Sequence, residues 1–220
     1  GILFKARGDY KKAVSCFRKA LALRPAFPAA HLHLGLLYAD QNDIQNAHTV
    51  LRNAITTLPN NSRLYNALGM VYSKKNDLEA ALDSYLRAVN LDPSNYDAIN
   101  NVTLLLIKLR RFQEAFPYAV KAVQIRTDSP ELYLNLGIVC FNLGRIDESI
   151  AAYKNALNLN QEYVDAHFNL GVVLMRIQNK QKESLEHFQK VLELQPNHPN
   201  KELILGIISK FKKRQNGLQG

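Results

Sequence analysis

Three asparagines stand at equal intervals of 34 residues in this chain, at Asn101, Asn135 and Asn169. A carboxamide side chain offers two hydrogen-bond donors and an acceptor oxygen. An evenly spaced row of such groups could hold the backbone of an extended peptide without reading its side chains. The alternative is that these asparagines bond to one another, or to the backbone, between adjacent structural repeats.

Residues typical of enzymes and metal sites are few. His31 and His33 lie on different faces of a helix, whereas two zinc ligands on one helix are spaced i, i+4. Cys16 and Cys140 are far apart and each lies in a helical pattern, which predicts two reduced thiols. The sequence contains no recognisable phosphate loop or nucleophile elbow. We therefore expect a non-catalytic protein with no metal site and no cofactor.

The net charge of +9 is concentrated at the two ends of the chain. Residues 1–27 carry seven Lys or Arg and one acid, and residues 199–220 carry five and one, so the ends sum to +6 and +4. The remaining body, 28–198, sums to −1. A nucleic-acid groove needs a basic stripe along its binding face, so no nucleic-acid partner is predicted. Membrane contact is expected only through the basic termini.

The elements that must position the asparagines repeat with the same period. Gly35, Gly69, Gly137 and Gly171 are separated by 34, 68 and 34 residues. A period of this length is typical of a solenoid, in which neighbouring repeats stack to form one core. Full repeats are predicted at 28–61, 62–95, 96–129, 130–163 and 164–198, after a partial repeat at 1–27, and each is read as two helices.

A glycine inside a helix costs ~1 kcal/mol relative to alanine. We expect close approach of the adjoining helix to explain Gly69. In repeat 62–95 the apolar positions of the two helices, with the proline that ends the second, are Tyr65, Leu68, Gly69, Tyr72, Ala81, Tyr85, Ala88 and Pro93.

This pattern resembles the tetratricopeptide repeat (TPR), and repeat 62–95 matches the motif at all eight places. Repeat 96–129 departs most from it, with Thr103 in place of Gly, Ala119 in place of the aromatic residue, and Pro117 inside the second helix. The resemblance covers nearly the whole chain. It implies an all-α fold, a right-handed TPR superhelix built of helix pairs.

The resemblance also implies that the first helices of the repeats line a concave groove that holds a protein or peptide partner. The row of asparagines is similar to the asparagine ladder of the O-linked N-acetylglucosamine transferase superhelix, which holds extended peptides. On this basis the predicted groove residues are Asn101, Asn135, Asn169, His33, Asn66, Asn100, Leu134, Phe168, Lys74, Lys108 and Arg176. Inter-helix packing is the alternative role for the apolar members, and ordinary solvated surface is the alternative for the cations.

The ends of the chain carry their own expectations. We predict one TPR solenoid over 1–214, closed by a capping helix at 199–214 and followed by a flexible tail at 215–220. The first repeat lacks most of its first helix, so self-association through this truncated repeat is a further hypothesis. The chain does not begin with Met, so the natural N-terminus is expected to be missing, and the expected location is cytoplasmic.

The sequence thus favours a non-catalytic interaction scaffold that binds an extended peptide in its concave groove. Two alternatives stay open: a self-assembling structural scaffold, and the targeting domain of a larger enzyme. A fold class by itself does not decide among them.

Overall fold

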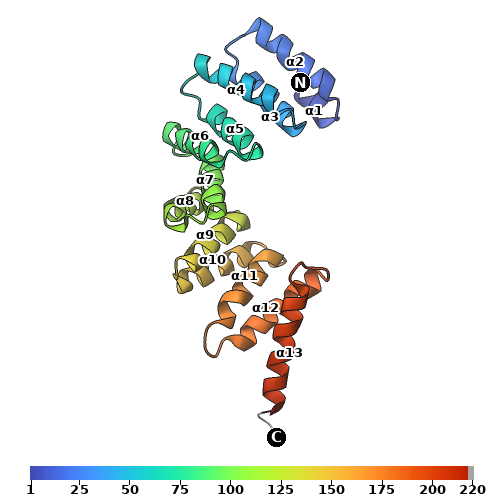
Figure 1. Ribbon diagram of the computed structural model, residues 1–220, viewed down its shortest axis with the longest axis vertical. Helices are drawn as coiled ribbons and strands as arrows, with labels where there is room; N and C mark the ends of the chain where they lie inside the picture. Colours follow the sequence, from blue (N-terminus) through green and yellow to red (C-terminus); the bar gives the residue numbers. More distant parts are fainter. Residues whose placement is uncertain (218–220) are drawn as a thin grey trace. The chain divides into compact units, whose positions relative to one another are not determined.

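The computed structural model describes the backbone of residues 1–217, with side chains except at 212 and 214–217. Within this range the chain forms thirteen α-helices and no strand (Figure 1), which confirms the predicted all-α fold. The first seven helices are α1 (Ile2–Ala6), α2 (Tyr10–Leu23), α3 (Pro28–Asp40), α4 (Ile44–Thr57), α5 (Ser62–Lys74), α6 (Leu78–Leu91) and α7 (Tyr96–Lys108). The next six are α8 (Phe112–Ile125), α9 (Pro130–Asn142), α10 (Ile146–Leu159), α11 (Val164–Met175), α12 (Gln181–Leu194) and α13 (Lys201–Gly217).

The helices fall into two compact units, Gly1–Arg110 and Arg111–Gly220, which are described separately as unit 1 and unit 2. Unit 1 contains α1–α7 and unit 2 contains α8–α13. The boundary falls inside the predicted repeat 96–129, between its two helices. One continuous solenoid over 1–214 stays a prediction.

The helix pairs follow the 34-residue period. Helices α3, α5, α7, α9 and α11 begin at the first residue of the five predicted full repeats. Within unit 1, α3 packs on α4 and α5 on α6, and the first helices α3, α5 and α7 also contact one another in sequence. Within unit 2, α9 packs on α10 and α11 on α12, and α9 contacts α11. The predicted pairing of a first and a second helix in these repeats is confirmed.

The close approach expected at the repeat glycine is confirmed. A Cβ added to Gly69 on α5 would lie 2.5 Å from Cδ1 of Tyr85 on α6. The added Cβ would also meet a buried second-helix side chain at Gly35, where the neighbour is Leu51, and at Gly171, where it is Phe188. The glycine therefore opens the space in which the large residue of the second helix lies.

The turn between the two helices of each repeat contains one residue with left-handed backbone. These residues recur at the same place of the motif, and they are Gly8, Asn42, Asn76, Arg110, Gly144 and Asn179, with φ between 58° and 75°. Glycine and asparagine tolerate this conformation best. The extra residue of repeat 164–198 lies in this turn, between the end of α11 and the start of α12.

Two sequence irregularities are accommodated locally. Helix α8 continues through Pro117, whose side chain is exposed. In α7 the hydroxyl of Thr103, which replaces the repeat glycine, is buried and donates to the Ile99 carbonyl at 3.0 Å.

Cys16 and Cys140 are both free, as predicted, and burial raises the pKa of the Cys140 thiol.

The last helix is longer than predicted. Helix α13 is described as far as Gly217, and no proline or glycine interrupts the helical pattern between Gly206 and that residue. The predicted flexible tail, 215–220, is therefore helical at 215–217, and residues 218–220 lie outside the described residues. Ile204 on α13 is fully buried against Phe188 and Val191 of α12.

Candidate functional site

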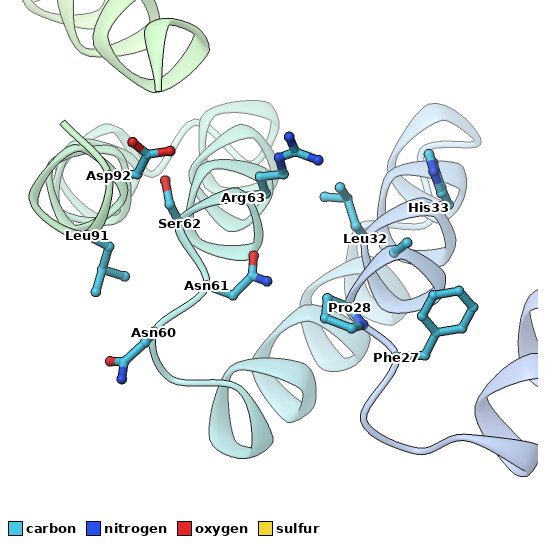
Figure 2. Close-up of a pocket in the computed structure, with 11 residues that line it drawn as sticks. Phe27, Pro28, Leu32, His33, Asn60, Asn61, Ser62, Arg63, Leu91 and Asp92 are labelled. Carbon is cyan, nitrogen blue, oxygen red and sulfur yellow. The ribbon is translucent and has the colours of Figure 1, made fainter. Parts of the chain in front are cut away.

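Two adjoining hollows lie over the first helices of unit 1. One of about 550 Å³ lies between the N-terminal ends of α3 and α5, and one of about 740 Å³ extends from α5 to α7. Both are lined by Leu32, Arg63 and Asp92, so they form one continuous surface, the first-helix groove. Figure 2 shows Leu32 and Arg63 facing the space between α3 and α5.

The floor of the first-helix groove is apolar. Leu32 and Leu36 on α3 are half-buried, and Met70 on α5 is 38% exposed. Leu104, which takes the same repeat position on α7 as Met70 does on α5, is 44% exposed. The groove therefore offers apolar surface that the helices of unit 1 leave open to a partner.

A pair of carboxamides spans the groove from one helix to the next. The Nδ2 amide of Asn101 on α7 donates to Oδ1 of Asn66 on α5 at 2.9 Å, and both residues are half-buried. This is the asparagine–asparagine contact between repeats that the sequence left open as an alternative. It links Asn101 to a different motif place of the preceding repeat, and it fixes the orientation of both side chains in the groove.

The two other asparagines of the predicted ladder lie in unit 2. Asn135 on α9 is buried, with 8% exposure, and it has an interaction partner. The Nδ2 amide of Asn169 on α11 donates to the Asp165 carbonyl of its own helix at 2.7 Å. Asn101 thus bonds across to the preceding first helix and Asn169 to its own helix, and a ladder through all three asparagines stays a prediction.

Several predicted groove residues are engaged in packing. The His33 ring stacks on Phe17 with centroids 5.7 Å apart, and burial together with Lys5 lowers its pKa. Leu134 is 9% exposed and belongs to the core of unit 2. Phe168 is half-buried, with its ring centroid 5.1 Å from that of His198. For Leu134 and Phe168 the structure favours the packing role.

The predicted cations also differ in their surroundings. The Lys74 ammonium donates to the Ala39 carbonyl at the end of α3 at 2.7 Å. The Arg176 guanidinium lies over the Phe141 ring, 4.7 Å from its centroid. Lys108 is exposed at the end of α7, and Asn100 is half-buried on the same helix and has contacts of its own.

Polar residues at the ends of helices, which were not among the predicted site residues, complete the groove. Arg63 and Asp97 lie at the start of α5 and α7, and Asp92 caps the end of α6. Hydrogen bonds from Ser94 hold the pKa of Asp92 below its usual value. One cation and two carboxylates give this rim mixed charge. Arg63 and Asp97 are each the second residue of their repeat, and this shared position could have indicated them as groove residues. Asp92 lies in the loop after α6, where the repeat gives no such signal.

The described residues contain no group of three or more His, Cys, Asp or Glu side chains placed to hold a metal ion. In the same part of the chain, none of the helices combines the length and apolarity needed to span a bilayer.

Residues 1–203 match the protein family described as the C-terminal domain of cilia and flagella-associated protein 70. The chain belongs to this family. The match covers the repeats of both units, from the partial repeat at the N-terminus into α13. No curated protein matches the chain.

Solved structures with this fold are TPR proteins. YrrB, described as a TPR protein with an unusual peptide-binding site, is 23% identical, with a TM-score of 0.75 over 88% of this chain and 97% of YrrB. MamA from Desulfovibrio magneticus RS-1 is 20% identical, with a TM-score of 0.70 over 77% of this chain and 95% of that one. At these identities the likeness shows the fold, and the chain is an all-α TPR protein.

Proposed function

We propose that this protein is a non-catalytic interaction scaffold of cilia or flagella, and that the first-helix groove of unit 1 holds an extended segment of a partner protein. The observation that carries the proposal is the Asn66–Asn101 pair beside the open apolar floor of Leu36 and Met70. Membership of the family named for a cilia and flagella-associated protein supports the location. The peptide-binding site named for YrrB supports the mode of binding.

The paired carboxamides suit the backbone of an extended peptide. One amide hydrogen of Asn101 is used by Asn66. The second amide hydrogen of Asn101, and the amide of Asn66, have the chemistry to bond a peptide carbonyl, and the carboxamide oxygens can accept a peptide N–H. Because the pair is already oriented, less conformational entropy is lost when it binds.

Apolar side chains of the partner segment would rest on Leu32, Leu36 and Met70. The rim carries Arg63 against Asp92 and Asp97, so no single sign of charge dominates. We therefore expect the affinity to come from apolar contact and backbone hydrogen bonds, and to change little with ionic strength.

The test starts from peptides selected on the whole chain from a random display library. We expect Asn66→Ala/Asn101→Ala to weaken binding of a selected peptide by ~5- to 100-fold, since each lost hydrogen bond contributes ~0.5–1.5 kcal/mol. Changing both partners avoids leaving one unpaired carboxamide. Calorimetric titration measures the affinity, and thermal unfolding checks that the variant is folded.

Two further variants locate the effect. Asn53→Ala removes an exposed carboxamide from the second helix α4 and should leave the affinity unchanged. Asn169→Ala asks whether the ladder continues into unit 2, and a loss of affinity there would extend the site beyond the groove. Equal affinity of the wild type and the Asn66/Asn101 double variant would contradict the proposal.

A further inference from the structure

Two histidines meet side by side between the helices of the last repeat. Nδ1 of His167 on α11 and Nδ1 of His187 on α12 are 2.8 Å apart, and the ring centroids are 5.1 Å apart. On its other side, Nε2 of His167 lies 2.9 Å from the Gln161 carbonyl, which can only accept a hydrogen bond. Nε2 of His167 therefore carries a proton, and His167 Nδ1 accepts from the Nδ1–H of His187 when both rings are neutral.

This contact tolerates one added proton and not two. A proton added to Nε2 of His187 leaves its Nδ1–H donating to His167. A second proton must go to Nδ1 of His167, where it would face the Nδ1–H of His187. Two N–H groups and two positive charges cannot share a 2.8 Å contact, so the rings must separate.

The surroundings of the pair disfavour the charged form of His187. Burial and then His167 lower the pKa of His187 below its usual value of 6.5, and Lys154 on α10 acts in the same direction. Glu183 and Glu186 on α12 oppose this effect. Glu183 is partly neutralised, since its Oε1 is 3.3 Å from the Lys154 ammonium.

The histidine pair lies next to the residues of α11 and α12 that pack against the last helix, α13. Phe168 and Phe188 follow the two histidines in sequence, and their ring centroids are 6.0 Å apart. Phe188, Val191 and Ile204 of α13 form a buried cluster, with Phe168 packed against it. His198, just before α13, also lies against Phe168, with ring centroids 5.1 Å apart, and is 7% exposed. Separation of the histidine rings would disturb both phenylalanines and so the pocket that holds Ile204.

An earlier repeat gives the matched arrangement without the second histidine. His31 takes the same motif place as His167, and its Nε2 lies 2.8 Å from the Pro25 carbonyl six residues earlier, as His167 does from Gln161. Allowing for the one-residue insertion, Val50 corresponds to His187. The Nδ1 atom of His31 has no hydrogen-bond partner in the structure. The carbonyl contact is thus shared by two repeats, whereas the histidine pair is specific to the last one.

We propose that His167 and His187 form a proton-sensitive latch, which holds α13 on the last repeat when at most one of the two rings is charged and releases it when both are charged. The latch responds to mild acid. It is independent of the first-helix groove, because every residue it uses lies in unit 2, whereas the groove is lined by residues of unit 1.

Amide hydrogen exchange on the full chain at pH 7.0, 6.0 and 5.5, corrected for intrinsic exchange rates, tests the latch. If local opening of the helices takes up one proton, the opening equilibrium constant rises up to ~tenfold for each unit by which the pH falls. We therefore expect the opening equilibrium of the α12 and α13 amides to rise ~3- to 30-fold between pH 7.0 and 5.5. The amides of α3–α6 should change less over this range.

His187→Val installs the residue of the earlier repeat and should abolish most of the pH response of α12 and α13. His167→Tyr, which copies Tyr65 and Tyr133 at the same motif place, should do likewise and serves if the valine variant does not fold. His31→Tyr is the matched control and should keep the response. The proposal is overturned if α12 and α13 keep their protection from exchange at pH 5.5 in the wild type. It is also overturned if His187→Val and His167→Tyr both lose this protection at pH 5.5 as much as the wild type does.

Discussion

Gly69 shows at the scale of one residue how the repeat pattern becomes a packed structure. Tyr85 is 5% exposed, and burial raises its pKa to about 12. Its ring lies where the side chain of residue 69 would otherwise project. The motif therefore joins a small residue on the first helix to a large one on the second, and the two positions must change together.

Gly69→Ala should destabilise the protein. Alanine gains ~1 kcal/mol of helix propensity, but overpacking beside a fixed buried ring costs ~1–3 kcal/mol. We expect a net loss of up to ~2 kcal/mol in the free energy of unfolding, measured with urea. Gly206→Ala is the control, because a Cβ at Gly206 on α13 meets no atom within 4 Å and should be neutral or stabilising. Destabilisation by both changes would mean that the Tyr85 contact is not the cause.

Single residues also mark where sequence reasoning stopped. The close approach of a helix to Gly69 could be predicted, because a glycine inside a helix is destabilising and a close helix contact offsets that cost. An asparagine–asparagine bond between adjacent repeats was an open alternative, but the partners Asn66 and Asn101 could not be predicted, because they occupy two different positions of the repeat and their pairing depends on how neighbouring first helices are offset. The burial of Leu134 has the same origin: periodicity gives the face of a helix, and the neighbouring helix decides how much of that face stays open.

At the scale of the elements, the two units cap their second helices differently. In unit 1, Asp9, Asp43 and Asp77 each accept a hydrogen bond from a backbone N–H of the first turn. In unit 2 the corresponding places hold Arg111, Arg145 and Lys180, which make no side-chain cap bond. Arg145 instead bonds to Glu148 at 2.7 Å, within the first turn of α10.

Asp77→Ala should therefore cost ~0.5–2 kcal/mol of stability, the usual effect of removing an N-cap. Lys180→Ala changes the same place in unit 2, where the side chain caps nothing and lies 3.9 Å from Glu183 in an exposed pair. We expect its effect to stay below ~1 kcal/mol. Urea unfolding of both variants measures the difference, and an equal cost for the two would argue against the capping role of Asp77.

Helix boundaries were the most predictable part of the elements. The first helices begin where the 34-residue repeats begin, because asparagine, proline and turn residues recur at the same intervals. The helical conformation of residues 215–217 in α13 could not be predicted, since the sequence there contains neither a repeat partner nor a strong helix signal. The boundary between the two units at Arg110 has no signal in the sequence, because the repeat pattern runs through it without a break in composition.

At the scale of the whole molecule, histidines make stability depend on pH. The pKa values of His33, His48 and His187 all lie below the usual 6.5, and burial is the first cause in each case. The folded chain therefore binds fewer protons than the unfolded chain just below pH 6.5, so stability falls as the pH drops through this range.

We expect the urea midpoint to fall between pH 7.5 and 5.5, before the carboxylates titrate. The lowered pKa values of Asp92 and Glu131 act only at more acidic pH, where their contribution to stability is lost as they become protonated. Parallel unfolding curves of His187→Val should show a smaller fall. A midpoint that stays constant or rises over this range would contradict the burial of these histidines.

The measurement that tests the central claim most directly is photocrosslinking of a display-selected peptide to the full chain. A benzoylphenylalanine replaces Met70 in the first-helix groove, and in a second protein it replaces the exposed Arg52 on the second helix α4. The account predicts a peptide adduct at position 70 and none at position 52. An adduct at position 52 with none at position 70 would place the peptide outside the groove and contradict the proposed function.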